Sequence, residues 1–151
     1  MWPVKPAEPP FVEGLTPDDE DAAVTLWRKK RVTRPWKDAR ADFQQALASD
    51  SSYLLGMRDA GRLVGTAMVT DDGRYGRVDY VAVASGAPEA EIASLLLEAA
   101  AKRLIARGMT RMIFGSGAMR LIRRYLGSEM LTIPGRIVRV DALVRFYADL
   151  T

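Results

Sequence analysis

The sequence contains no cysteine and no histidine. Without cysteine, the chain has no disulfide scaffold, no thiol nucleophile and no cysteine ligand for a metal. Without histidine, it lacks the side chain that most often serves as a general base or as a metal ligand. These absences exclude Ser-His-Asp hydrolases and the usual zinc hydrolases, and no metal site is predicted. Any catalysis has to rest on carboxylates, Tyr, Ser, Lys, Arg, backbone dipoles or a bound cofactor.

Long apolar runs are also missing, because none approaches the roughly 18 residues that a membrane span needs. The segment 1–11 carries four prolines and no apolar stretch of the kind found in signal peptides. We therefore expect a cytoplasmic protein that does not enter a membrane. The 151 residues are 48% apolar and 27% charged, which is typical of a globular domain and not of a disordered or fibrous chain.

The charge of the chain comes mainly from arginine. The net charge is +3, and the 22 basic residues comprise 17 Arg and 5 Lys. Arginine binds planar anions such as phosphate and carboxylate. Because the charge is spread over several segments, we expect no nucleic-acid surface. The basic run at 28–31 complements the dipole at the end of a helix, and anion binding is the alternative interpretation.

Periodicity and turn signals divide the chain into a proline-rich arm at 1–14 and one domain at 15–151. Thr16 and Pro17 predict a helix start, and Gly108 predicts the end of the long helix. The expected helices are 17–30, 39–48, 88–107 and 118–126. The expected strands are 52–58, 62–70, 77–83 and 111–114, with a terminal hairpin over 131–147 and a short strand near 11–13. The hairpin offers edges for a homodimer.

The long helix is expected to lie on a sheet, as the crossover between two parallel strands. Its predicted apolar arc consists of Ile92, Leu95, Leu96, Ala99, Ala100 and Leu104. Glu98 and Lys102 form an i,i+4 pair on its polar side. Residues 60–61 and 71–73 predict tight turns between antiparallel strands. The elements together predict a mixed α/β fold with a central mixed sheet flanked by helices.

This order of elements resembles the GNAT superfamily, the acetyl-CoA-dependent N-acetyltransferases. Local sequence supports the resemblance across about residues 10–130. The segments that carry it are TLW at 25–27, RPWKD at 34–38, GRLVGTA at 61–67, YVAV at 80–83 and LGSE at 126–129. The resemblance implies a GNAT-like acyl-CoA N-acyltransferase fold, acetyl-CoA as cofactor, and an amine on a small molecule or a protein as acyl acceptor.

The resemblance also implies cofactor-binding residues. In the family, one strand splays from its parallel neighbour, and its free backbone groups hold the pantetheine arm; here these groups would belong to Val81, Ala82 and Val83. A loop that opens the long helix holds the pyrophosphate, which places Ile92 and Ala93 beside it.

The pyrophosphate loop departs from the family pattern. The family signature Q/R-x-x-G-x-G/A aligns with the sequence PEAEIA at 88–93, so only Ala93 agrees. Pro88 has no amide hydrogen to donate. Glu89 and Glu91 place negative charge at the helix start, where a pyrophosphate would be repelled.

Proton transfer also departs from the family pattern. The family's general-acid tyrosine aligns with Arg123, which cannot be an acid near neutral pH but can bind a phosphate or stabilise a thiolate. Tyr125 lies about 200° further round the helix and is expected to face elsewhere. Asp79 and Tyr80 alternate on the cofactor strand, so we expect them on opposite faces, one of them toward the cleft. The candidate catalytic residues are Asp79, Tyr80 and Tyr125.

A Gly-Ser-Gly junction at 115–117 is either a tight turn or an anion site formed by Ser116 and the following arginines. Three functions remain open. The first is an N-acetyltransferase with an altered cofactor loop. The second is a catalytically degenerate GNAT-fold domain that acts as a binding or assembly module for a protein partner. The third is a binder of another anionic ligand through an arginine-rich face. An active enzyme requires an open cleft between residues 78–83 and 111–114.

Overall fold

The computed structural model describes residues 12–115, 118, 130–133, 136–140 and 147–149. The helices are the 3₁₀ turn η1 (Pro17–Asp19), α1 (Glu20–Lys29), α2 (Ala39–Ala48) and α3 (Glu89–Ala106). The strands are β1 (Glu13–Gly14), β2 (Ser52–Asp59), β3 (Arg62–Asp71), β4 (Gly76–Val83), β5 (Arg111–Phe114), β6 (Met130–Ile133), β7 (Arg136–Val140) and β8 (Tyr147–Asp149).

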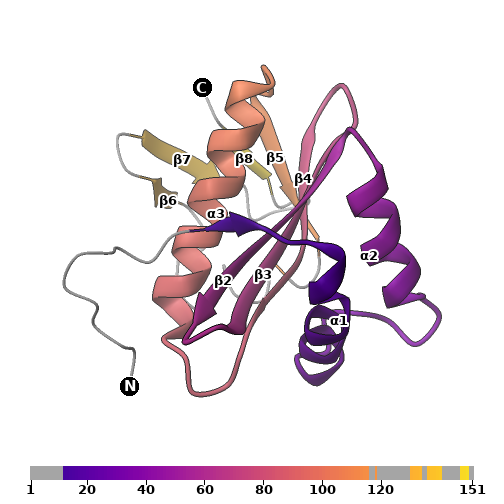
Figure 1. The fold of residues 1–151 in the computed structure, drawn as a ribbon. Helices are drawn as coiled ribbons and strands as arrows, with labels where there is room; N and C mark the ends of the chain where they lie inside the picture. Colours follow the sequence, from indigo (N-terminus) through magenta and orange to yellow (C-terminus); the bar gives the residue numbers. More distant parts are fainter. Residues whose placement is uncertain (1–11, 116–117, 119–129, 134–135, 141–146, 150–151) are drawn as a thin grey trace.

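All of these strands join one sheet in the order β1-β2-β3-β4-β5-β8-β7-β6. β4 and β5 are parallel and are connected through α3, whereas the other neighbouring strands run antiparallel. Figure 1 shows α3 lying across the strands on one side, with α1 and α2 on the other side. This mixed sheet with flanking helices confirms the predicted fold class.

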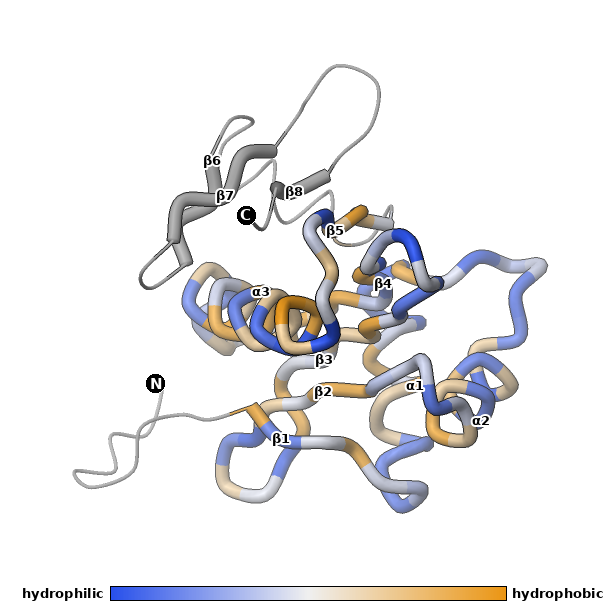
Figure 2. The backbone as a smooth tube through the Cα atoms, turned by 90° about the horizontal axis from the view of Figure 1, so that it is seen from above, coloured by the Kyte–Doolittle hydropathy of each residue, from blue (hydrophilic) through white to orange (hydrophobic). Residues whose placement is uncertain are grey.

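The sheet separates two hydrophobic clusters, so the molecule has three layers (Figure 2). The α3 cluster joins the inner face of α3 to side chains of β2–β5. The α1–α2 cluster joins Trp27 and Phe43 to the opposite face of β2, β3 and β4. Both aromatic side chains are fully buried, so each helix contributes a large anchor to the layer.

Most predicted elements are confirmed within one or two residues. The bounds of α2 and β5 coincide with the prediction. The short strand near 11–13 is β1, which pairs with β2. At the predicted end of α3, the amide of Gly108 donates to the carbonyl of Ile105 at 2.9 Å. Residues 60–61 both have positive φ, which fits the tight turn between β2 and β3.

Three predictions about elements need correction or lie partly outside the described residues. The first predicted helix divides into η1 and α1, because the Thr16 amide donates to the Asp19 carboxylate at 2.8 Å and closes a separate first turn. The predicted hairpin over 131–147 is confirmed for β6 and β7, which pair antiparallel, but Tyr147 begins the separate strand β8, which pairs with β5 as well as β7. Ala118 is helical, and the rest of the predicted helix 118–126 lies outside the described residues.

The buried stripe of α3 differs from the predicted arc. Leu95 and Ala99 are only half-buried, whereas Ala93, Leu97 and Ala101 are buried. The reason is a close approach to the sheet at Gly65, where a Cβ would lie 2.6 Å from Ile92 Cγ2. The predicted polar pair is confirmed, with Lys102 Nζ 2.9 Å from Glu98 Oε1. Among the described helices, none has the length and apolarity to cross a membrane.

Candidate active site

The two parallel strands at the centre of the sheet separate part of the way along β4. Their pairing ends with Val78 opposite Phe114, and the amide of Gly115 then donates to the Val78 carbonyl at 2.8 Å. In the described part of the chain, β4 has no further pairing on its β5 side beyond Val78. Among the described residues, the remainder of β4, from Asp79 to Val83, therefore has no strand partner on its β5 side, and we call this free edge the opening beside β4.

A β-bulge lies in β4 at the start of this opening. Met68 of β3 is opposite Asp79, but Thr66 is opposite Ala82, so Tyr80 and Val81 together face the single residue Ala67. Tyr80 has a φ of 52°, a left-handed conformation that is unusual for a bulky residue. Bulges of this kind redirect side chains and end pairing next to active sites.

The bulge determines which backbone groups face the opening. The Ala84 amide donates to the Val64 carbonyl at 2.8 Å, so Ala84 and, two residues earlier, Ala82 face β3. Val81 and Val83 therefore direct their backbone groups to the other side. The prediction that Val81, Ala82 and Val83 all offer free backbone groups was therefore wrong for Ala82. The extra residue in the bulge exchanges the residues of β4 whose backbone groups face β3 with those whose groups face away.

The same bulge brings Asp79 and Tyr80 together. Both side chains line a cleft of about 560 Å³ between α2 and β4, along with Lys37, Asp42, Ser49 and Met68. The prediction that Asp79 and Tyr80 point to opposite faces was wrong, since an extra residue at a bulge breaks the period of two. None of the described residues that line this cleft comes from 111–114, so it is not the predicted cleft between residues 78–83 and 111–114 but a separate one on the α2 side of β4.

The Tyr80 side chain is held by two contacts within the α1–α2 cluster. Its hydroxyl donates to the carboxylate of Asp42 on α2, and its ring lies 4.1 Å from the Trp27 ring, centroid to centroid. The side chain is 5% exposed. Burial and the neighbouring Asp42 carboxylate raise the pKa of the Tyr80 hydroxyl above its ordinary value, so it remains protonated at neutral pH. It can donate a hydrogen bond but cannot serve as a base.

Asp79 lies at the point where the strands separate. Arg77 Nε donates to Asp79 Oδ2 at 2.7 Å. A Cβ on Gly115 would collide with Asp79 Oδ1, so a larger residue at position 115 would force the Asp79 carboxylate to move. The first glycine of the predicted anion-binding junction is therefore in contact with a carboxylate of the protein itself.

The start of α3 is less suited to a phosphate than the family loop. Pro88 is the N-cap, and the Ile92 amide already donates to the Pro88 carbonyl at 3.0 Å. The side chains of Ile92 and Ala93 are buried in the α3 cluster. The prediction that these two residues contact the cofactor is corrected, because neither the Ile92 amide nor either side chain is available.

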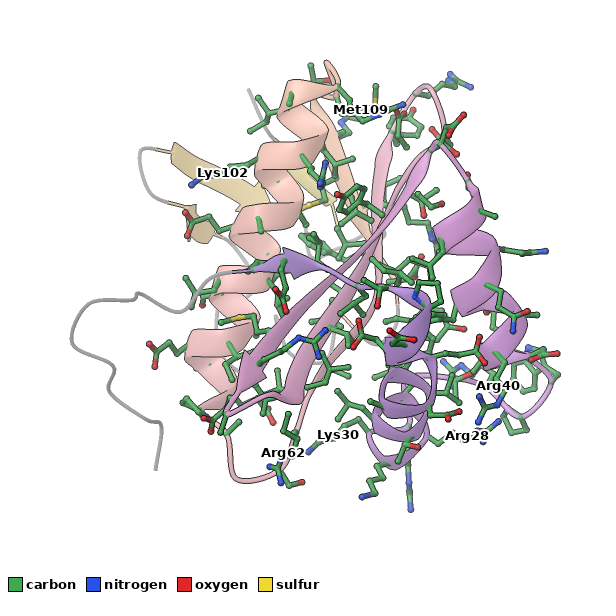
Figure 3. All side chains as sticks on the ribbon, viewed as in Figure 1. Arg28, Lys30, Arg40, Arg62, Lys102 and Met109 are labelled. Carbon is green, nitrogen blue, oxygen red and sulfur yellow. The ribbon has the colours of Figure 1, made fainter. Side chains whose placement is uncertain are left out.

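A basic side chain reaches the loop before α3. Lys30 Nζ, at the end of α1, donates to Ser85 Oγ at 3.0 Å. Figure 3 shows Lys30 and Arg62 at the end of the molecule where α1 ends. The basic run at 28–31 thus contributes one contact to the loop that joins β4 to α3.

Sequence reasoning missed Asp42, Lys37 and Thr66. Asp42 occupies the first turn of an amphipathic helix, where a carboxylate is explained by the helix dipole alone. Its contact with Tyr80 spans 38 residues of chain, so no local pattern reveals it. The predicted site residues Ser116, Arg123 and Tyr125 lie outside the described residues. Within the described part of the chain there is no group of three or more acidic side chains that could hold a metal.

Known proteins resemble this chain in sequence. The profile of the Acetyltransferase (GNAT) family matches residues 20–127. An acetyltransferase of Pectobacterium atrosepticum is 35% identical over 91 residues, which cover 60% of this chain and 64% of that protein. The matched region therefore spans less than two thirds of the relative's length.

Solved structures resemble the chain in fold. A GNAT-family acetyltransferase from Staphylococcus aureus has a TM-score of 0.68 at 13% identity, and the match covers 95% of this chain and 100% of that one. An aminoglycoside 6′-acetyltransferase type Ii has a TM-score of 0.67 at 13% identity, covering 93% and 97%. At these identities the likeness concerns the fold alone. Because the family profile extends over most of the chain, the protein belongs to the acetyltransferase (GNAT) family.

Proposed function

We propose that this chain transfers an acetyl group from acetyl-CoA to an amine. The observation that carries the proposal is the opening beside β4, where a bulge turns the backbone groups of Val81 and Val83 away from β3. Such groups are available to pair with the amides and carbonyls of a pantetheine arm. The cleft with Asp79 and Tyr80 adjoins the same stretch of strand and provides space for an acceptor.

The residues fit one half of the cofactor better than the other. The free edge at Val81 and Val83 fits the pantetheine arm, whose amides need both donors and acceptors. The start of α3 fits the pyrophosphate poorly, because Pro88 lacks an amide hydrogen and Glu91 adds negative charge there. We infer that affinity rests mainly on the β4 edge, and that the phosphates lie away from the acidic turn.

When bound, acetyl-CoA would supply a thioester whose carbonyl carbon is the electrophile. Val81 N–H is the backbone donor available to the carbonyl oxygen, where negative charge develops during attack. We assign Asp79 to receiving the proton of the attacking amine, directly or through water. Tyr80, kept protonated, donates to Asp42 and shapes the wall of the acceptor cleft. Arg123, which was predicted to bind a phosphate or stabilise a thiolate, and the candidate catalytic residue Tyr125 both lie outside the described residues.

The residues that line the cleft indicate the chemical class of the acceptor. Its charged lining residues are Lys37, Asp42 and Asp79, which suits a polar amine better than an apolar one. One solved structure of similar fold is named as an aminoglycoside 6′-acetyltransferase. We propose a polar small-molecule amine as the first class to screen, with protein amines as the second.

Calorimetric titration with acetyl-CoA and with coenzyme A tests the proposal. We expect micromolar binding with one cofactor per chain at both low and physiological salt. Binding that persists at physiological salt would confirm that the β4 edge carries most of the affinity. The absence of heat at millimolar cofactor, with the protein shown to be folded, would overturn the proposal.

A second candidate function is a binding module that no longer uses coenzyme A. The acidic start of α3, with Glu91 exposed and Pro88 as N-cap, favours it. A module of this kind would give no heat with acetyl-CoA and would be sought through its protein partners. The same titration therefore separates the two candidates.

A further inference from the structure

The α1–α2 side of the sheet contains a buried relay of three hydrogen-bonding groups. Trp27 Nε1 donates to Thr66 Oγ1 at 2.9 Å, and Thr66 Oγ1 donates to the Tyr80 carbonyl at 2.9 Å. Trp27 and Thr66 are both fully buried. Because bulk water cannot replace these contacts, each group depends on the next one for its hydrogen bond.

The direction of this relay is determined by chemistry. An indole N–H can only donate, so the Thr66 hydroxyl must act as the acceptor toward Trp27. The single hydrogen of the hydroxyl is then left for the Tyr80 carbonyl. Rotating the hydroxyl would leave a buried donor or acceptor without a partner, which is costly. Trp27 thereby orients Thr66, and Thr66 holds the Tyr80 carbonyl.

The Tyr80 carbonyl belongs to the same peptide unit as the Val81 N–H. In a trans peptide the C=O and the N–H point in opposite directions, and the structure contains no cis peptide bond in its described residues. The hydrogen bond from Thr66 therefore directs Val81 N–H away from β3, to the opening beside β4. The left-handed φ of Tyr80 is a strained conformation that only its surroundings can maintain.

We propose that Thr66, held by Trp27, is a positioning residue that aims the Val81 N–H at the acetyl carbonyl. The inference rests on the proposed acetyl transfer. It adds to that function two residues that do not touch the substrate and act only through the peptide between Tyr80 and Val81.

Two substitutions of Thr66 form a matched pair. Thr66→Val preserves the shape but removes the hydroxyl, whereas Thr66→Ser preserves the hydroxyl and removes a methyl group. We expect kcat of Thr66→Val to fall about 10- to 100-fold, because a misaimed group of this kind costs that much in rate. The dissociation constant for coenzyme A should stay within about twofold, because coenzyme A lacks the acetyl carbonyl. Thr66→Ser should retain most of kcat.

A readout independent of turnover is the carbonyl stretch of bound acetyl-CoA labelled with ¹³C in the acetyl group. A hydrogen bond from Val81 N–H lowers this frequency relative to that of free acetyl-CoA. Thr66→Val should lose most of the lowering and Thr66→Ser should retain it. Trp27→Phe keeps an aromatic ring against Tyr80 but leaves the Thr66 hydroxyl free to rotate. We therefore expect the carbonyl frequency to be lowered less than in wild type and more than in Thr66→Val.

Controls separate positioning from a general loss of stability. Val24 is buried in the α1–α2 cluster but takes no part in the relay. Val24→Ala shortens this side chain and should lower stability without changing the carbonyl frequency. Equal damage from Thr66→Ser and Thr66→Val would overturn the proposal, because it would implicate the packing of the methyl group. An unchanged frequency and kcat in Thr66→Val would overturn it as well.

The free protein gives a test that does not need the cofactor. In a ¹H–¹⁵N spectrum, Thr66→Val should shift the Val81 amide signal and accelerate its exchange with solvent, and Thr66→Ser should do neither. An unchanged Val81 signal in Thr66→Val would show that the relay does not orient the peptide. If wild-type protein binds no acetyl-CoA, the proposed function fails and the catalytic role of Thr66 is overturned, whereas a changed spectrum would still assign Thr66 to holding the bulge.

Discussion

The two faces of the central sheet are built differently. The α3 cluster consists of apolar side chains, from Leu55 on β2 to Ala118. The α1–α2 side contains Trp27, Tyr80 and both buried polar residues found among the described residues, Asp19 and Thr66. One face is therefore close to a simple hydrophobic interior, and the other combines burial with directed hydrogen bonds.

This difference shows that one face of the sheet mainly stabilises the fold, whereas the other holds the backbone of the proposed site in a particular conformation. Apolar burial has no preferred direction, so the α3 face can stabilise the sheet without constraining any single backbone group. Buried polar groups need partners with defined geometry, and in exchange they hold a particular conformation. The bulge in β4, which is strained at Tyr80, lies against the polar face that can hold it.

The largest effect should come from the apolar face. Leu104 on α3 is 1% exposed, and Leu104→Ala should lower the free energy of unfolding by about 2–5 kcal/mol. The half-buried Leu95 offers a control on the same helix, and Leu95→Ala should cost less. Urea unfolding measures both. A loss of acetyl-CoA affinity in folded Leu104→Ala protein would contradict the division between the two faces.

The next effect concerns a buried carboxylate at the start of α1. Asp19 accepts from the Thr16 amide and from Arg58 Nη2 at 2.7 Å. Burial alone would raise the pKa of Asp19, but these hydrogen bonds and the Arg58 charge outweigh it and hold the pKa below its ordinary 3.8. Asp19→Asn should lower the free energy of unfolding by about 1.5–3 kcal/mol.

The same shift predicts a dependence on pH. Because the folded pKa of Asp19 is depressed, its contribution is fully present above pH 3.8 and is lost as the pH falls through the lower folded value. Unfolding free energies measured along an acid titration should therefore converge for wild type and Asp19→Asn. Asp18→Asn, which alters an exposed neighbour, should leave the unfolding free energy at neutral pH close to that of wild type.

A smaller effect is expected at the acceptor cleft. Tyr80→Phe keeps the ring against Trp27 but removes the hydrogen bond to Asp42, and should lower the free energy of unfolding by about 1 kcal/mol. Because the folded pKa of Tyr80 is raised, its stabilising contribution is present below pH 10 and is lost as the pH rises through the folded value. As the pH is raised, the unfolding free energy of wild type should therefore begin to fall from its neutral-pH value at a lower pH than that of Tyr80→Phe.

The control for this prediction is Tyr53→Phe, at a tyrosine that is 40% exposed. It should not change the unfolding free energy at neutral pH by a comparable amount. In the proposed reaction, Tyr80→Phe should raise KM for the acceptor and leave the affinity for acetyl-CoA unchanged. A change in the affinity for acetyl-CoA alone, with KM for the acceptor unchanged, would contradict the assignment of Tyr80 to the acceptor cleft.

The smallest effect should appear at the acidic start of α3, the position at which the family loop would hold the pyrophosphate. Glu91 is exposed there, and Glu91→Gln removes a negative charge. We expect acetyl-CoA to bind about threefold more tightly at low salt, with the gain disappearing as salt screens the charge. Calorimetry at two salt concentrations measures it. Glu98→Gln, further along α3, should give no gain, and an equal gain there would show a general charge effect.

Much of the fold was predictable because its signals are local. The apolar runs of β2 and β3, the glycine after α3 and the acidic start of α1 depend on residues within a few positions of one another. The faces of Asp79 and Tyr80 were predicted wrongly, because a bulge is set by pairing with β3 and not by the sequence of β4. Asp42 and Thr66 were missed because their partners lie 38 and 14 residues away.

The sequence by itself determined the order of helices and strands, the absence of thiol and imidazole chemistry, the family, and the acidic turn that opens α3. Only the tertiary structure decided that Val81 and Val83, and not Ala82, face the opening beside β4. The physical reason is that alternation along a strand is a local property, whereas its phase is set by hydrogen bonds to a neighbouring strand. One inserted residue, held by Trp27 and Thr66, inverts that phase where the proposed chemistry takes place.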